Sequence, residues 1–170
     1  MRQQHIKINI PRQQLELFAA DELICRYDIS TASNGVGEIN GSECTPRGRH
    51  IIRAKIGEDA RANTVFRARR PTGETFSEAL RQEFPERDWI LTRILWLSGK
   101  EPGRNRLGNV DTMRRYIYIH GSPDADIMGV PSSHGCIKMK NADVIDLFAR
   151  VEVGTVVDII DDVQSRESNS

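Results

Sequence analysis

The stretch SSHGCIKM, residues 132–139, is the most informative part of this sequence. It places the thiol of Cys136 two residues after the imidazole of His134, and a second imidazole, His120, precedes it by a short loop. Cysteine acts as a nucleophile through its thiolate, which a neighbouring imidazole can generate or stabilise. Gly135 has no side chain, so a substrate can approach the backbone beside the thiol. These residues predict a cysteine nucleophile assisted by histidine.

The other cysteines are interpreted differently. A free cysteine is usually a small buried apolar residue, and we expect this of Cys25 and Cys44. At Cys136 the flanking His134 and the upstream His120 favour a nucleophile instead. The three cysteines lack the spacing of a disulfide framework, and the sequence has no Cys-x-x-Cys pair typical of a zinc site. We therefore expect no metal and no cofactor.

Alternation of apolar and polar residues predicts a mainly β fold. The expected strands cover residues 5–10, 15–18, 23–29, 49–56, 89–97, 116–119 and 153–160. A short helix is expected over 77–84, and a second helix begins near Asn141, with Asn141 or Asp143 as its cap. The expected architecture is a mixed-sheet sandwich or partly closed barrel with one or two helices. His120 is expected where a strand meets a loop, a common position for catalytic groups.

Composition limits the class of protein. The 170 residues are enough for one domain, expected over 1–162 with a flexible tail over 163–170. The 24 basic and 24 acidic residues balance, so net charge gives no support for nucleic-acid binding. Mean hydropathy is −0.48, and no apolar run reaches the roughly 20 residues of a membrane span. The start of the sequence has no signal-peptide pattern, which favours a cytoplasmic location; a removed leader would place the protein in the periplasm or cell envelope.

These motifs resemble the catalytic signature of the L,D-transpeptidase family (the YkuD-type domain), bacterial enzymes that act on peptidoglycan stem peptides. The family has a histidine followed by a small residue, matched by His120 and Gly121. It then has Ser/Thr-His-Gly-Cys and an aliphatic residue, matched by residues 133–137. Lys138 stands where the family usually has arginine, and it keeps the charge without the planar fork. The turn at residues 45–48, Thr-Pro-Arg-Gly, also resembles the family's pattern.

The resemblance implies a role for each residue of the motif. Cys136 is the nucleophile and His120 is the general base, oriented by the carbonyl of Gly121 or, as a weaker candidate, by Ser122. His134 lines the site and tunes the thiolate, or has a structural role. The remaining implied residues are oxyanion donors, the N–H groups of Gly135 and Cys136, and substrate-binding residues, Ser132, Ser133 and Lys138.

The resemblance also implies a reaction. Cys136 attacks the L-centre carbonyl of diaminopimelate in a tetrapeptide stem and releases the terminal D-alanine. Water as the acceptor gives an L,D-carboxypeptidase of peptidoglycan recycling acting on muropeptides, the favoured interpretation. An amine acceptor gives 3→3 crosslinks in the cell envelope, and a non-catalytic peptidoglycan-binding module is a remote alternative. The basic cluster Arg67, Arg69 and Arg70 is either solvated surface or a wall of the substrate groove.

Overall fold

The structure is a computed structural model that describes residues 3–162. The tail expected over 163–170 lies outside the described residues. The elements in chain order are β1 (Gln4–Asn9), β2 (Gln14–Ala19), β3 (Glu22–Ser30), β4 (Gly48–Ile56), β5 (Thr64–Arg67), β6 (Arg70–Thr75), α1 (Glu78–Glu83), β7 (Ile90–Gly99), the short 3-10 helix η1 (Gly108–Val110), β8 (Tyr118–Ser122), β9 (Ile137–Lys140), α2 (Asn141–Arg150) and β10 (Val156–Ile160). Among the described residues, no helix is long and apolar enough to cross a bilayer.

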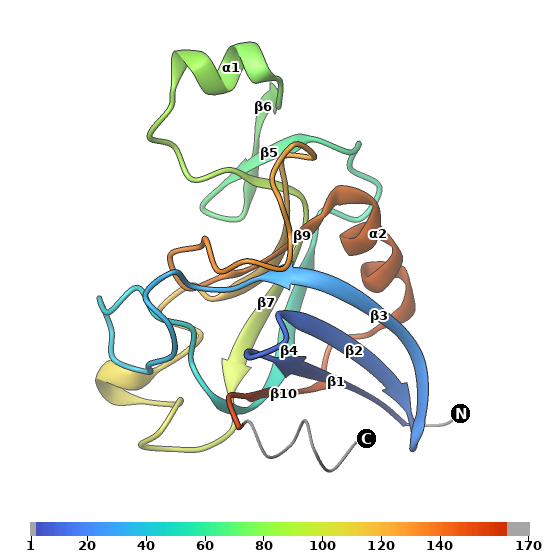
Figure 1. Ribbon diagram of the computed structural model, residues 1–170, viewed down its shortest axis with the longest axis vertical. Helices are drawn as coiled ribbons and strands as arrows, with labels where there is room; N and C mark the ends of the chain where they lie inside the picture. The colour runs from blue at the N-terminus through green and yellow to red at the C-terminus, as the bar shows by residue number, and fades with distance from the viewer. Residues whose placement is uncertain (1–2, 163–170) are drawn as a thin grey trace.

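Eight strands close into a mixed barrel (Figure 1). Their order is β4-β10-β1-β2-β3-β9-β8-β7, and β7 pairs with β4 to complete the ring. The pairs β1–β10 and β8–β9 are parallel, and the other pairs of the ring are antiparallel. The mainly β fold predicted from the sequence is confirmed, and the structure shows that the barrel is closed.

The barrel core follows from strand alternation. In β1, Ile6 and Ile8 are fully buried, whereas His5 and Lys7 point away from the core. The helix α2 packs against β7, β8 and β9, and its buried Val144 joins the same apolar cluster as the strand residues. The helix therefore fixes the part of the barrel that carries β8 and β9.

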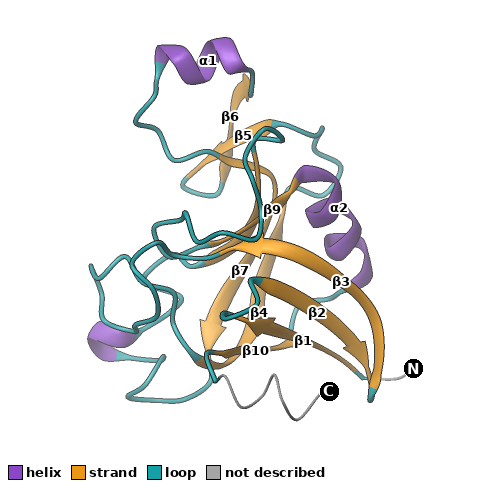
Figure 2. Ribbon diagram, viewed as in Figure 1, coloured by secondary structure: helices purple, strands orange, loops and turns teal. Residues whose placement is uncertain are grey.

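The β5–β6 hairpin and α1 project from one end of the barrel (Figure 2). The hairpin is attached through the pairing of β5 with β7. The helix expected over 77–84 is present as α1, and the Ser77 hydroxyl caps it by accepting the N–H of Leu80 at 3.1 Å. The sequence did not predict the hairpin, because most side chains of β6 are exposed and give no alternation.

The cap expected for the second helix is wrong. Lys140 occupies the N-cap position of α2 and makes no side-chain capping bond. Asn141 is the first residue of the helix, and its side chain is buried against Thr92 of β7, whose hydroxyl donates to the Asn141 Oδ1 at 2.6 Å. Because α2 follows β9 without a loop, Asn141 lies against β7 and contacts Thr92. Its side chain therefore does not cap the helix.

Alanine substitution should destabilise the protein much more at a buried apolar residue than at an exposed one. Leu95 is fully buried in the barrel core, and Leu95→Ala should lower the free energy of unfolding by about 2–5 kcal/mol through lost burial and a cavity. Ile127 is 76% exposed, so Ile127→Ala should change it by less than about 0.5 kcal/mol. Urea denaturation monitored by tryptophan fluorescence measures both, and equal effects would contradict this assignment of the core.

Candidate active site

The parallel pairing of β8 and β9 assembles the residues of the motif. Ile119 pairs with Ile137 and His120 with Lys138. Ile119 and Ile137 are buried in the barrel core, so His120 and Lys138, which alternate with them, lie on the outer face. Cys136 directly precedes β9 and shares this face. Cys136 lies two residues before Lys138, the residue that pairs with His120, so Cys136 and His120 are diagonal neighbours on adjacent strands. The rise per residue and the distance between strands place their Cα atoms roughly 8 Å apart.

The Cys136 thiol is partly buried beside the start of β8. Its Sγ accepts the backbone N–H of Tyr118 at 3.3 Å and lies 3.4 Å from the carbonyl oxygen of Tyr116, to which the thiol can donate. Burial raises the pKa of Cys136 to about 12, although the Tyr118 N–H and the positive charge of Lys138 favour the thiolate. The thiol is therefore protonated at neutral pH.

His120 is held in one tautomer. Its Nδ1 lies 2.7 Å from the carbonyl oxygen of Gly121, which can only accept, so Nδ1 carries the proton. Nε2 is buried and has no hydrogen-bond partner among the described residues. Burial lowers the pKa of His120, so the ring is neutral at pH 7 with a free lone pair on Nε2. The ring is thus in the form that can accept a proton.

The expected position of His120 at a strand end is wrong. His120 is the middle residue of β8 and is fully buried, and no hydrogen bond joins it to Cys136 within residues 3–162. The strand extends past His120 because Gly121 and Ser122 continue the parallel pairing with β9. Catalytic hydrogen bonds are often open in the absence of substrate, so this geometry is compatible with a general base.

Gly121 has no room for a side chain. A Cβ atom there would lie 2.5 Å from the Asn141 Oδ1 and 2.6 Å from the carbonyl oxygen of Leu91. The opposing strand is irregular at this point, where Thr92 adopts a φ of +75°, an unusual value for a β-branched residue. The tight contact of β7 with β8 therefore depends on glycine next to His120. Thr92 was missed from the sequence, although this polar residue interrupts an apolar run.

The turn before Cys136 is fixed by backbone contacts. Ser133 is buried, and its hydroxyl donates to the carbonyl of Cys136 at 2.6 Å and accepts the N–H of Gly135 at 3.1 Å. The Thr45 hydroxyl donates to the carbonyl of Gly135 at 2.9 Å. Gly135 has a φ of +130°, a conformation that favours glycine. Because its N–H is already bonded, Gly135 does not offer this N–H as an oxyanion donor in the resting structure.

Ser132 and Lys138 lie at the edge of the site. Ser132 is exposed, and its carbonyl oxygen lies 3.4 Å from the Nζ of Lys138. The positive charge of Lys138 lowers the pKa of both Cys136 and His120. Both residues are open enough to meet a substrate, whereas Ser133 is occupied by the turn.

A cavity of about 420 Å³ opens onto the Cys136 thiol. It lies within the volume range of small-molecule sites. The exposed His134 lines it, whereas the fully buried His120 is not among its lining residues. The other lining residues come from the hairpin, the start of β7 and the segment before β8: Ala68, Arg69, Asp88, Ile90, Arg115, Tyr116, Ile117 and Tyr118.

Comparison with known families gives a match over nearly the whole chain. The model of the L,D-transpeptidase catalytic domain (YkuD) matches residues 3–159. The chain belongs to the L,D-transpeptidase catalytic-domain family. The family resemblance inferred from the motif residues is thereby confirmed, and a comparison with curated protein sequences found no match.

Solved structures show that this L,D-transpeptidase domain has the family's fold. An L,D-transpeptidase from Mycobacterium smegmatis matches with a TM-score of 0.56 and 15% identity, covering 94% of this chain and 59% of that protein. L,D-transpeptidase 3 from Mycobacterium tuberculosis matches with a TM-score of 0.58 and 12% identity, and the match covers 94% of this chain and 62% of that protein. An L,D-transpeptidase from Xylanimonas cellulosilytica matches with a TM-score of 0.54 and 17% identity, and the match covers 94% of this chain and 61% of that protein. The chain thus spans about three fifths of the length of these proteins.

The sequence singled out Cys136 and His134 but not most of the other residues of the cavity wall. Of the basic cluster at the hairpin, Arg69 lines the cavity, whereas Arg67 and Arg70 are exposed and do not. Arg115 was also missed; its guanidinium donates to the carbonyl of Cys44 at 2.6 Å. Nothing in the sequence singles out Asp88, because its place beside Cys136 depends on how the hairpin folds onto β7.

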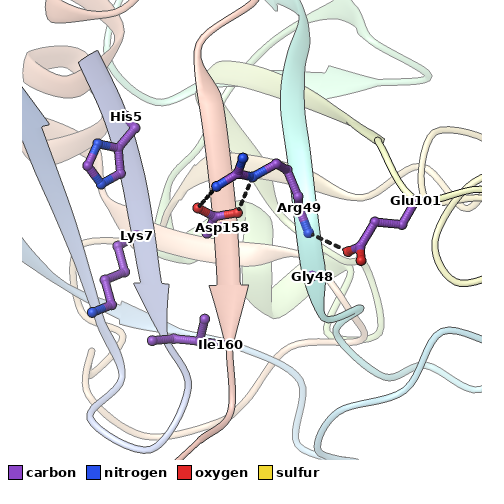
Figure 3. A pocket seen from close by; sticks show the side chains of 7 residues that line it. All are labelled: His5, Lys7, Gly48, Arg49, Glu101, Asp158 and Ile160. Carbon is purple, nitrogen blue, oxygen red and sulfur yellow. Dashed lines mark hydrogen bonds and ion pairs between the residues drawn. The ribbon is translucent and has the colours of Figure 1, made fainter. Parts of the chain in front are cut away.

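A second hollow of about 450 Å³ lies over β1, β10 and β4 and shares no lining residue with the Cys136 cavity (Figure 3). The Arg49 guanidinium donates to the Asp158 carboxylate at 2.9 and 3.0 Å, and the Arg49 N–H donates to Glu101 at 2.8 Å. With Lys7, the lining holds two cations and two anions, which balance, and it includes no cysteine or serine. The candidate chemistry of the L,D-transpeptidase domain therefore belongs to the Cys136 cavity.

Adjacent serines test the structure of the turn. Ser133→Ala should lower the free energy of unfolding by about 1–3 kcal/mol, because it leaves the Gly135 N–H without a partner. Ser132→Ala removes an exposed hydroxyl and should change it by less than about 0.5 kcal/mol. Urea denaturation compares the two variants. A Ser133→Ala protein as stable as Ser132→Ala would show that the turn does not depend on this hydroxyl.

Proposed function

We propose that this L,D-transpeptidase domain catalyses cysteine-dependent acyl transfer on peptidoglycan tetrapeptide stems. The observation that carries the proposal is the state of His120, whose proton is fixed on Nδ1 by the Gly121 carbonyl while Nε2 stays free on the face that carries Cys136. A neutral imidazole with an available lone pair is what a general base requires. Membership in the family supplies the substrate class.

The proposed reaction begins with the neutral thiol. Cys136 Sγ attacks the L-centre carbonyl carbon of diaminopimelate, and His120 Nε2 takes the thiol proton as the C–S bond forms. The tetrahedral intermediate then expels the nitrogen of D-alanine, which receives that proton from His120. The products of this half-reaction are free D-alanine and a thioester on Cys136. Transfer during attack, and not a preformed thiolate, agrees with the raised pKa of the thiol.

Water is the proposed acceptor for the thioester. His120 takes a proton from water as its oxygen attacks the thioester carbonyl, and the departing sulfur recovers a proton, which leaves a tripeptide. Water needs no binding site of its own, and the cavity of about 420 Å³ lies toward the smaller end of ligand sites. This is L,D-carboxypeptidase activity, which we place in peptidoglycan recycling on muropeptides in the cytoplasm. The alternative is an amine acceptor and 3→3 crosslinking in the cell envelope.

Mass spectrometry of the products tests this reaction. Incubation with a diaminopimelate tetrapeptide muropeptide should remove one alanine, and Cys136→Ala should lower the rate at least about 10³-fold because the thioester cannot form. Cys25→Ala is the matched control and should retain activity, since the Cys25 thiol bonds to Tyr27 and does not line the cavity.

The same experiment distinguishes the acceptors. Tripeptide as the sole product at high substrate concentration supports water, and crosslinked dimers support transpeptidation. Binding without turnover by the unmodified protein, or turnover that survives in Cys136→Ala, would overturn the proposed mechanism.

The acid limb of the pH profile tests His120 as the base. Because burial lowers the pKa of His120, the ring stays neutral below the ordinary value of 6.5 and loses its lone pair only at lower pH. The acid limb of kcat/KM, which reports groups of the free enzyme, should therefore lie below pH 6.5. His134→Gln should leave its position unchanged. A limb at or above pH 6.5 that His134→Gln moves would assign the base to His134 instead.

A further inference from the structure

The tip of the β5–β6 hairpin has a strained turn that directs one side chain toward the cavity. Arg67 pairs with Arg70, so Ala68 and Arg69 form a two-residue turn, and both have positive φ values, 48° and 64°. Turns of this kind favour Asn-Gly, because a side chain disfavours positive φ. The turn nevertheless carries alanine and arginine, and both line the cavity.

The Arg69 side chain is held in place along the cavity wall. Its guanidinium carbon lies 4.4 Å from the ring centre of Trp96 and 5.1 Å from that of Tyr116. Its Nη1 donates to the Tyr118 hydroxyl at 2.9 Å. Tyr118 is also the residue whose N–H donates to the Cys136 Sγ. The guanidinium is thus fixed near the nucleophile, and it makes no ion pair with a carboxylate of residues 3–162.

Asp88 supplies a negative charge to the same cavity. No hydrogen bond or ion pair to its carboxylate occurs within the described part of the chain. Its charge raises the pKa of both Cys136 and His120, so it lies within electrostatic reach of both. Asp88 and Arg69 line one cavity but do not pair with each other. The cavity therefore offers one cation and one anion to a ligand.

Arg115, the other cation of the cavity wall, is already occupied. Its guanidinium donates to the carbonyl oxygens of Gly37 at 3.2 Å and Cys44 at 2.6 Å, and to the Ser42 hydroxyl at 3.4 Å. These contacts fasten the segment that carries Cys44 to the site. Arg69 is therefore the cation of this wall that remains available to a substrate.

We propose that Arg69 and Asp88 form a subsite for an α-amino acid zwitterion, the far end of the diaminopimelate side chain of the stem that Cys136 attacks. Arg69 binds its carboxylate through the planar guanidinium, and Asp88 binds its ammonium group. This inference rests on the proposed function and adds the basis of its selectivity. A stem with lysine in place of diaminopimelate keeps the ammonium but has no carboxylate for Arg69.

The test compares two tetrapeptide stems that differ in the third residue, meso-diaminopimelate or lysine. The wild-type protein should show a kcat/KM at least about 10-fold higher on the diaminopimelate stem. Arg69→Gln should lower kcat/KM on that stem about 10- to 100-fold and change it less than about threefold on the lysine stem. Arg67→Gln alters a neighbouring cation that does not line the cavity, and it should preserve the wild-type preference.

A second comparison tests Asp88 with two substrates, the lysine stem and the same stem acetylated at Nε. Asp88→Asn should lower kcat/KM on the free amine about 10-fold or more and leave that on the acetylated amine unchanged, because acetylation removes the charge that Asp88 binds. Thermal unfolding of each variant verifies that it is folded, and the second substrate of each pair is an internal control for a general defect of the site.

The outcomes separate this inference from the function on which it rests. Turnover of both stems without preference, or an equal loss on both stems in Arg69→Gln, would overturn the zwitterion subsite and leave the acyl-transfer function intact. An Asp88→Asn effect that is the same on free and acetylated amines would assign Asp88 to the chemistry of Cys136 and His120 instead. Failure of the wild-type protein to release alanine from any stem would overturn the proposed function itself.

Discussion

The parallel pairing of β8 with β9 is the constraint on which the site depends. A parallel pair needs a long connection, here the segment between Ser122 and Ile137, to bring the chain back in the same direction. Its register directs Ile119 and Ile137 into the core and leaves His120 and Cys136 on the outer face. A shift of one residue would exchange the two faces, placing the thiol in the core and isoleucine on the outside. The apolar core thus fixes the register of His120 and Cys136.

Desolvation sets the protonation states at this face. Burial raises the pKa of Cys136 and lowers that of His120, so both groups are neutral in the resting protein. The nearby charges of Lys138 and Asp88 have opposite signs and partly cancel at both groups. A neutral pair is stable without substrate, and in the proposed mechanism attack begins when a carbonyl carbon is brought to the thiol. In the proposed mechanism, positioning of the substrate therefore controls the reaction, and the charged residues of the cavity wall would provide that positioning.

Several residues around the site have positive φ values, as do residues elsewhere in the chain. Thr92 lies in the strand beside His120, and Ala68 and Arg69 form the hairpin tip that faces Cys136. Each is held by contacts elsewhere: Thr92 by its bond to Asn141, and Arg69 by two aromatic rings and the Tyr118 hydroxyl. Strain that is retained by specific contacts commonly marks functional regions. In this protein, the unusual backbone conformations orient these side chains in directions that a regular strand would not allow.

The sequence by itself determined the motif residues and most of the strands. Cys136, His134 and His120 could be recognised because their chemistry depends on residue type and short spacing, and β1 to β3 because alternation is a local property. Only the tertiary structure decided the closure of the barrel through β4 and β7, the complete burial of His120, and the meeting of Arg69 and Asp88 at the thiol. These features join segments far apart in the chain. No local pattern encodes such contacts, because they arise from the packing of the whole barrel.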